Sequence, residues 1–95
     1  MTPVIFRRFK KGGDVIAIFP TIPGDSSPAT CSSYQHVGQH GACDPIGLVR
    51  DTIPASTAEA DVAKLQRELV DQGYDYLVVI KRARYRHYLE RKRDA

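Results

Sequence analysis

The segment Ser56–Gly73, with the sequence STAEADVAKLQRELVDQG, decides the fold because it predicts an amphipathic helix with defined ends. Ser56 and Glu59 form a capping box, in which the serine oxygen binds the Glu59 N–H group and the glutamate binds that of Ser56. Gly73 can adopt the left-handed conformation that ends a helix. Four apolar residues recur at helical spacing and form one stripe: Ala58, Val62, Leu65 and Leu69. We therefore expect a helix from about Thr57 to Gln72 that packs on one face of a sheet.

Strand-forming runs precede this helix and supply the expected sheet. Val4–Phe9 and Val15–Phe19 flank a Gly-Gly turn, a pattern that is typical of a hairpin. A third strand is predicted over Thr30–Val37, with alternate side chains facing opposite sides. Ile46–Ile53 is a weaker candidate strand because it contains a glycine and an aspartate.

The chain after the helix contains one more expected strand and a basic segment. Tyr74–Lys81 has apolar residues on both faces, which indicates an interior strand. From Arg82 onward the sequence fits either a helix or a continuing strand. In the helix, three residues form the inner stripe: Tyr85, Tyr88 and Leu89. In the strand, three arginines line one face: Arg82, Arg84 and Arg86.

The expected fold class is therefore α+β, in a single domain that covers residues 1–95. It combines a small antiparallel sheet of about three to five strands with one amphipathic helix packed on a face. A basic C-terminal helix or extension completes it.

Charge is distributed unevenly along the chain, although the net charge is only +3. Residues 1–11 carry four positive charges and no negative one, and residues 81–95 carry seven positive and two negative charges. Residues 12–80 carry three positive and nine negative charges. If the two ends meet in space, they form one electropositive patch opposite an acidic face. The apolar run before Arg7 is too short for a signal peptide or a membrane span, so we expect a cytoplasmic protein with no membrane partner.

The segment Cys31–Cys43, CSSYQHVGQHGAC, holds both cysteines and is the first place to look for chemistry. A zinc site here would use four ligands: Cys31, His36, His40 and Cys43. Only the histidine pair has the spacing of a zinc knuckle, which weakens this interpretation. A Cys31–Cys43 disulfide is a second alternative, disfavoured by a reducing compartment. A Cys31–His36 nucleophile pair is a third, but it lacks an orienting group.

We favour a structural interpretation of this segment, with Cys31 as a small buried hydrophobe and Tyr34 as a core aromatic. His36 and His40 would then be polar groups that the loop backbone satisfies. Because no acid–base pair can be identified, we expect a protein that is not an enzyme, with no catalytic residue, metal or cofactor. Tyr34, His36 and His40 remain the central-loop candidates for partner contact.

Basic residues at the two chain ends are the candidates for binding nucleic acid or another partner. They are Arg7, Arg8, Lys10, Lys11, Arg82, Arg84, Arg86, Arg91, Lys92 and Arg93. In the C-terminal group the arginines alternate with Tyr85, His87 and Tyr88, which suits phosphate contact together with stacking on exposed bases. A solvated charged face is the alternative. The sequence contains no RNP-type signature, GXXG clamp or zinc finger, so any binding should lack strong sequence preference.

Three segments carry a resemblance to a known family: FRRFKKGGDVIAIFPTIPGD (residues 6–25), SYQHVGQHG (33–41) and VIKRARYRHY (79–88). They are similar to a family of short, uncharacterised bacterial proteins associated with plasmids, prophages and other mobile elements. This resemblance implies an accessory role, such as nucleic-acid handling or inhibition of a host defence system. We therefore expect a non-enzymatic binding protein of a mobile element, with nucleic acid or a host protein as its partner. An anti-CRISPR-like inhibitor of a host protein is the first alternative, and a small zinc-binding protein is the second.

Overall fold

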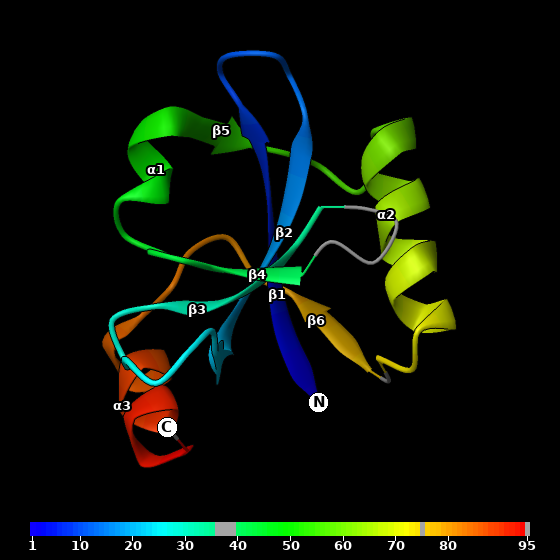
Figure 1. Cartoon of the computed structure of the whole chain (residues 1–95). Helices are drawn as coiled ribbons and strands as arrows, with labels where there is room; N and C mark the ends of the chain where they lie inside the picture. Colours follow the sequence, from blue (N-terminus) through cyan, green and yellow to red (C-terminus); the bar gives the residue numbers. More distant parts are fainter. Residues whose placement is uncertain (36–39, 75, 95) are drawn as a thin grey trace.

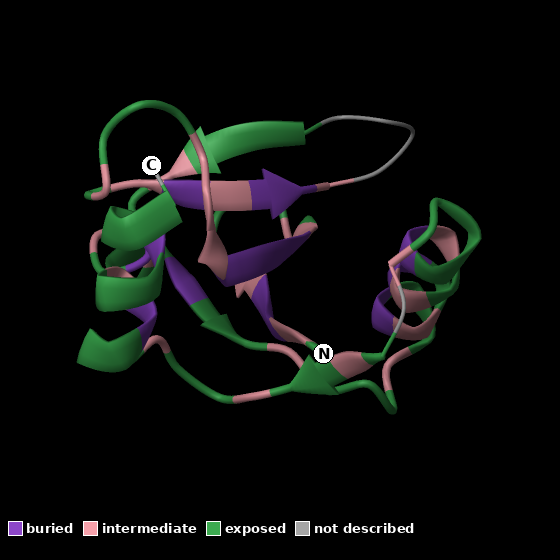
Figure 2. Ribbon diagram, turned by 90° about the horizontal axis from the view of Figure 1, so that it is seen from below, coloured by how far each residue is buried: buried purple, intermediate pink, exposed green. Residues whose placement is uncertain are grey.

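The structure is a computed structural model that describes residues 1–35, 40–74 and 76–94. Its elements, shown in Figure 1, are in chain order β1 (Thr2–Phe9), β2 (Val15–Pro23), β3 (Cys31–Tyr34), β4 (His40–Cys43), α1 (Leu48–Asp51), β5 (Thr52–Pro54), α2 (Ala60–Asp71), β6 (Leu77–Val79) and α3 (Tyr85–Asp94). The strands form one sheet, and α2 and α3 flank it on opposite sides (Figure 2). This arrangement confirms the predicted α+β class.

Strand β1 pairs with three other strands of the sheet, whose order is β4-β3-β2-β1-β5 with β6 also beside β1. One edge of β1 pairs with β2 through an antiparallel hairpin, as predicted. Its other edge is shared by two short strands. Thr2–Val4 pair in parallel with β6, and Arg7–Phe9 pair antiparallel with β5. The sheet therefore has six strands, one more than the upper limit expected from the sequence.

The hairpin turn depends on two glycines with positive φ, Gly12 at 90° and Gly13 at 78°. A side chain rarely adopts this conformation, so the Gly-Gly pair allows the chain to reverse. Both faces of β1 and β2 are buried, because helices cover the sheet on each side.

Helix α2 covers one face of the sheet with three of the four residues of the predicted apolar stripe; the fourth, Ala58, is exposed and precedes the helix. Val62, Leu65 and Leu69 are buried against Val4, Phe6, Ala17, Phe19 and Tyr34. The helix ends where predicted: Gly73 has a φ of 98° and its N–H donates to the Val70 carbonyl at 3.0 Å.

The start of α2 differs from the prediction. Glu59 is extended, so the helix begins at Ala60 and the residues from Thr57 to Glu59 lie outside it. Glu59 does accept the Ser56 N–H bond of the capping box. The Ser56 hydroxyl, however, accepts from the Ala58 N–H at 3.1 Å and not from that of Glu59.

Helix α3 covers the other face, where Ile5, Ile16, Ile18 and Cys31 form a second cluster. The helical alternative for the C-terminal segment is therefore confirmed. Its predicted inner stripe is wrong, because Tyr85 is 72% exposed and Leu89 is 47% exposed. The side chains that α3 buries are instead two polar ones: His87 and Arg91.

Two predicted strands are wrong in their extent or position. Ile46–Ile53 is not one strand: the Ile46 N–H donates to the Asp44 carboxylate and starts a turn, which leads into α1 before β5. In place of Tyr74–Lys81 the structure has only β6, at an edge, with Val79 45% exposed. Because β6 pairs only with β1, its apolar residues do not indicate an interior strand.

The strand predicted over Thr30–Val37 is shorter in the structure, where β3 covers Cys31–Tyr34. Its alternation is confirmed, because Cys31 packs in the α3-side cluster and Tyr34 in the α2-side cluster. His36 and Val37 lie outside the described residues. In the described part of the chain, no helix is long and apolar enough to cross a membrane.

Candidate functional site

The predicted basic residues divide into those that bind groups of the protein itself and those that do not. Arg7 belongs to the first kind: its Nε donates to the Thr52 hydroxyl and its terminal nitrogen to the Thr52 carbonyl, both at 2.9 Å. It is buried, and burial lowers its pKa. Arg7 therefore fastens β1 to β5 and is not part of an external surface.

Arg8 is also occupied. Its guanidinium contacts the carboxylates of Glu59 at 2.6 Å and Asp61 at 2.7 Å, and donates to the Gly13 carbonyl at 2.7 Å. The hydrogen bond with Arg8 lowers the pKa of Asp61. Nearby, the Lys10 amine donates to the Arg50 carbonyl at 3.0 Å. These contacts join the hairpin to the start of α2 and to α1.

Arg91 lies on the inner side of α3 and binds two backbone carbonyls. Its guanidinium donates to Pro20 at 2.6 Å and to Pro28 at 3.1 Å. The Pro20 acceptor lies where the register between β2 and β3 shifts after Phe19, because proline has no N–H to continue the ladder. The guanidinium carbon also lies 5.7 Å from the centre of the Tyr88 ring. Arg91 thus attaches α3 to the sheet.

Four other cations of the C-terminal segment line one depression of the surface. Lys81, Arg82, Arg84 and Arg86 line a hollow of about 490 Å³ together with Ile80, which we call the basic hollow. All four are exposed, and none of these side chains has a hydrogen bond or ion pair with the described residues. Lys81 was not among the predicted site residues, because the strand expected over Tyr74–Lys81 ends with it and the predicted basic surface began at Arg82.

A second depression adjoins the first and is mainly apolar. It has a volume of about 480 Å³, and we call it the apolar hollow. Its main apolar lining residues are Pro45, Ile46, Ala83, Tyr85 and Tyr88. Arg84 lines both hollows, so a cation stands at their junction. The helical alternative for the C-terminal segment placed Tyr85 and Tyr88 inside the protein, whereas their alternation with arginines suggested stacking on exposed bases. Neither pattern predicted that Pro45 and Ile46 would line a hollow with them.

Both ends of the loop that carries these cations are fixed. At its start the Ile80 N–H donates to the Val4 carbonyl at 2.9 Å. At its end the Arg84 N–H donates to Nδ1 of His87 at 2.9 Å, which satisfies a free donor at the beginning of α3. Burial, followed by the charge of Arg86, lowers the pKa of His87 and so favours the neutral ring, whose Nδ1 can accept this bond.

The two basic chain ends do not form one patch. Figure 1 shows the turn that contains Lys10 and Lys11 at the end of the molecule opposite α3. On α3, Lys92 is exposed, and Arg93 contacts the neighbouring Asp94 at 3.3 Å. The basic hollow is therefore the strongest concentration of unpaired positive charge in the described part of the chain.

The central segment brings its described residues together without an evident catalytic arrangement. Tyr34 is fully buried, and its hydroxyl accepts from the Gln72 side chain at 2.6 Å. His40 lies against the Tyr34 ring, with 4.8 Å between the ring centres, and its Nε2 is 3.4 Å from the Tyr74 hydroxyl. His36 lies outside the described residues.

The thiols of Cys31 and Cys43 face each other across β3 and β4, with their sulfurs 3.6 Å apart. Their shared hydrogen bond raises the pKa of Cys31, which burial raises further, and lowers the pKa of Cys43. Cys43 is therefore the more acidic and the more accessible thiol. Among the described residues, no group of three or more histidines, cysteines and acidic residues could hold a metal ion.

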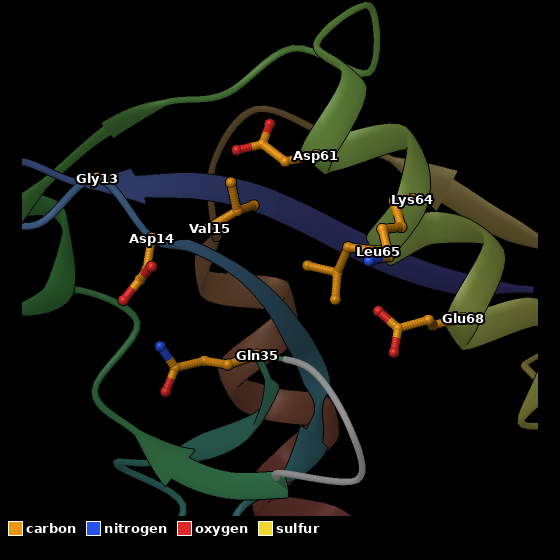
Figure 3. Close-up of a pocket in the computed structure, with 8 residues that line it drawn as sticks. All are labelled: Gly13, Asp14, Val15, Gln35, Asp61, Lys64, Leu65 and Glu68. Atoms are coloured by element: carbon orange, nitrogen blue, oxygen red, sulfur yellow. The ribbon is translucent and has the colours of Figure 1, made fainter.

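A third hollow, of about 300 Å³, lies between the β1–β2 hairpin and α2 (Figure 3). Its lining carries Asp14, Asp61 and Glu68 together with Lys64, so charges of both signs surround it. Asp61 already binds Arg8. Figure 3 shows Val15 and Leu65 between these polar groups, where α2 packs on the sheet. We interpret this hollow as part of the attachment of α2.

Comparisons with known proteins add no family to these observations. The functional interpretation therefore depends on the geometry of the basic and apolar hollows. No protein-family model matches the chain, and neither a curated protein nor a solved structure matches it.

Proposed function

We propose that this chain is a non-enzymatic, nucleic-acid-binding protein of a mobile element, and that the basic hollow contacts the phosphates. The observation that carries the proposal is the convergence of Lys81, Arg82, Arg84 and Arg86 on one hollow, where their side chains bind none of the described residues. The setting in a mobile element comes from the resemblance of three sequence segments and stays a prediction.

The contrast with the other cations supports this assignment. Arg7, Arg8 and Arg91 all bind acceptors within the protein, which explains their positions by folding alone. Within the described ranges, the four cations of the basic hollow have no acceptor that would explain their positions in this way. Like charges around one hollow repel each other, and a polyanion relieves that repulsion when it binds. Binding also releases the counterions that surround the nucleic acid.

The expected binding is independent of sequence, since contacts to phosphates carry no base information. Four phosphate contacts predict a log–log dependence of affinity on salt with a slope of about −3 for a single strand and about −3.6 for a duplex. Fluorescence anisotropy with labelled oligonucleotides over a salt series measures this slope. Replacement of both Arg84 and Arg86 by glutamine should flatten it by about one to two units.

A matched control separates this surface from the other basic end. The Lys10→Gln, Lys11→Gln variant removes the same charge at the opposite end of the molecule and should leave the slope unchanged. A host-protein inhibitor is the competing function. A pulldown from host lysate with and without nuclease distinguishes the two, because a partner held through nucleic acid is lost after nuclease treatment. Capture that survives nuclease, with no oligonucleotide binding at low salt, would overturn the proposal.

A further inference from the structure

The apolar hollow beside the basic hollow contains an aromatic stack that begins inside the protein and ends in solvent. Arg91, fixed by the carbonyls of Pro20 and Pro28, lies over the Tyr88 ring. Tyr88 stacks in turn on Tyr85, with 5.8 Å between ring centres and 29° between ring planes. Tyr85 is the last member of this stack and is 72% exposed.

We infer that this stack is a binding site for an unpaired base, and that the protein prefers single-stranded nucleic acid over a duplex. This inference rests on the proposed function, because it assumes that the neighbouring cations hold the phosphates. A nucleotide joins an anionic phosphate to a flat, largely apolar base. The structure offers the same pair of environments side by side, with Arg84 at their junction.

Folding alone does not explain the position of Tyr85. Its ring is mostly in solvent, although α3 buries two polar residues on its inner face. Ile46, which is 80% exposed, lines the same hollow, so two large exposed apolar side chains line one depression. A base that stacks on Tyr85 would cover this surface. In a duplex, the bases are already stacked and paired, so they cannot reach it without being extruded.

The hollow contains one carboxylate, that of Asp44, whose Oδ1 accepts the Ile46 N–H at 3.0 Å. A carboxylate repels phosphate, but it can accept hydrogen bonds from the amino groups of a base. The phosphate therefore belongs on the side of Lys81, Arg82 and Arg86, and the base belongs beside Tyr85. This places the nucleotide in one orientation.

The test uses two probes: an oligothymidylate with one 2-aminopurine, and a blunt duplex of the same length. Fluorescence of 2-aminopurine falls when the base stacks, so it reports the base subsite separately from affinity. Wild-type protein should quench the single-stranded probe. Tyr85→Ala should abolish the quenching and weaken single-strand binding by about five- to 150-fold, the range for loss of one stacked base. Tyr85→Phe keeps an aromatic face and should retain both effects.

Tyr76→Ala is the matched control, since Tyr76 is 84% exposed and directly precedes β6, a strand that lies away from α3 in Figure 1. It should bind both probes like the wild type. Thermal unfolding of each variant checks that it is folded.

The outcomes separate this inference from the proposed function. If both probes bind with equal affinity and Tyr85→Ala changes neither, the base site is wrong and phosphate binding stands. If neither probe binds at low salt, the proposed function fails and the inference fails with it. A protein partner that depends on Tyr85, in the absence of oligonucleotide binding, would assign the apolar hollow to protein recognition.

Discussion

Helices α2 and α3 cover opposite faces of the same sheet, but they attach to it through different chemistry. α2 buries Val62, Leu65 and Leu69 in an apolar cluster. α3 buries His87 and Arg91, whose polar groups bind the backbone. The α2 side therefore follows the usual partition of apolar and polar residues, and the α3 side departs from it.

This difference shows what a buried arginine makes possible. The carbonyls of Pro20 in β2 and Pro28 in the following loop accept hydrogen bonds from Arg91. These bonds offset the cost of burying the guanidinium. Because Arg91 and His87 occupy the inner side of α3, Tyr85 and Leu89 lie on the outer side. The polar attachment thus leaves the ring of Tyr85 exposed.

We expect the largest loss of folding stability from a substitution on the α2 side of the sheet. Leu69→Asp places a charge in the apolar cluster, and we expect it to destabilise the fold by more than about 4 kcal/mol. That loss approaches the whole stability of a small domain, so the variant should be unfolded by circular dichroism. Val70→Asp is the neighbouring control, since Val70 is 54% exposed, and should remain folded. A folded Leu69→Asp protein would contradict the apolar attachment of α2.

On the α3 side, Arg91→Ala should lower the free energy of unfolding by about 3 kcal/mol, because it leaves the carbonyls of Pro20 and Pro28 without their donor. Denaturant unfolding measures this loss. Arg93→Ala removes an equal charge from the exposed part of α3 and should change stability by less than about 0.5 kcal/mol. Equal effects of the two substitutions would mean that charge, and not the buried contacts, attaches α3.

We also expect that a disulfide can form on the α3 side of the sheet and stabilise the fold. Cys31 and Cys43 are directly opposite in the β3–β4 ladder, and residues so paired have Cα separations within the range of a disulfide. Oxidation with diamide should join them within one chain and lower the mass by two hydrogen atoms. Closure of this loop predicts a gain of about 2–3 kcal/mol in stability. Cys43→Ser should show neither change, and intermolecular dimers of the wild type would contradict the pairing.

The smallest effect concerns pH. Because the pKa of His87 is lowered in the folded state, the unfolded state binds more protons below the ordinary value of 6.5. Stability should therefore be full above about pH 6.5 and decrease as the pH falls below it. Arg84, Arg86 and Arg91 favour the neutral ring, whereas Glu90 opposes them.

His87→Gln tests this dependence, since glutamine at the same helical position can accept the Arg84 N–H bond without titrating. The variant should lose less stability than the wild type between about pH 6.5 and 5, measured by thermal unfolding. If thermal stability falls equally with pH in the two proteins, His87 is not the source of the pH dependence. Other titrating groups, including Glu59 and Asp61, are common to both proteins.

The same contrast explains what could be predicted from the sequence. The stripe of α2 is apolar and periodic, so its burial was predictable. The end of the helix was predictable from Gly73. Arg91 resembles any surface cation in the sequence, and its acceptors lie 63 and 71 residues away. The inner face of α3 was therefore predicted wrongly.

The site was predicted in part for a similar reason. Composition alone located the C-terminal arginines, but it could not separate Arg91, which binds inside, from Arg84, which lies at the junction of two hollows. The place of Ile46 in the apolar hollow could not be predicted, because Ile46 precedes α1 and is distant in sequence from α3. The parallel pairing of Thr2–Val4 with β6 could not be predicted either, because no local sequence pattern indicates it.

The divided edge of β1 has a consequence for synthesis on the ribosome. The hairpin partner β2 emerges soon after β1, but the strands that cover the other edge, β5 and β6, are translated much later. Until then, the backbone donors and acceptors of that edge are open beside Val4, Ile5 and Phe6, all of which are buried in the finished protein. Such an edge can pair with other chains. We therefore expect the nascent protein to pass through an aggregation-prone stage before β5 and β6 are available, and chaperone supply during expression to affect its yield.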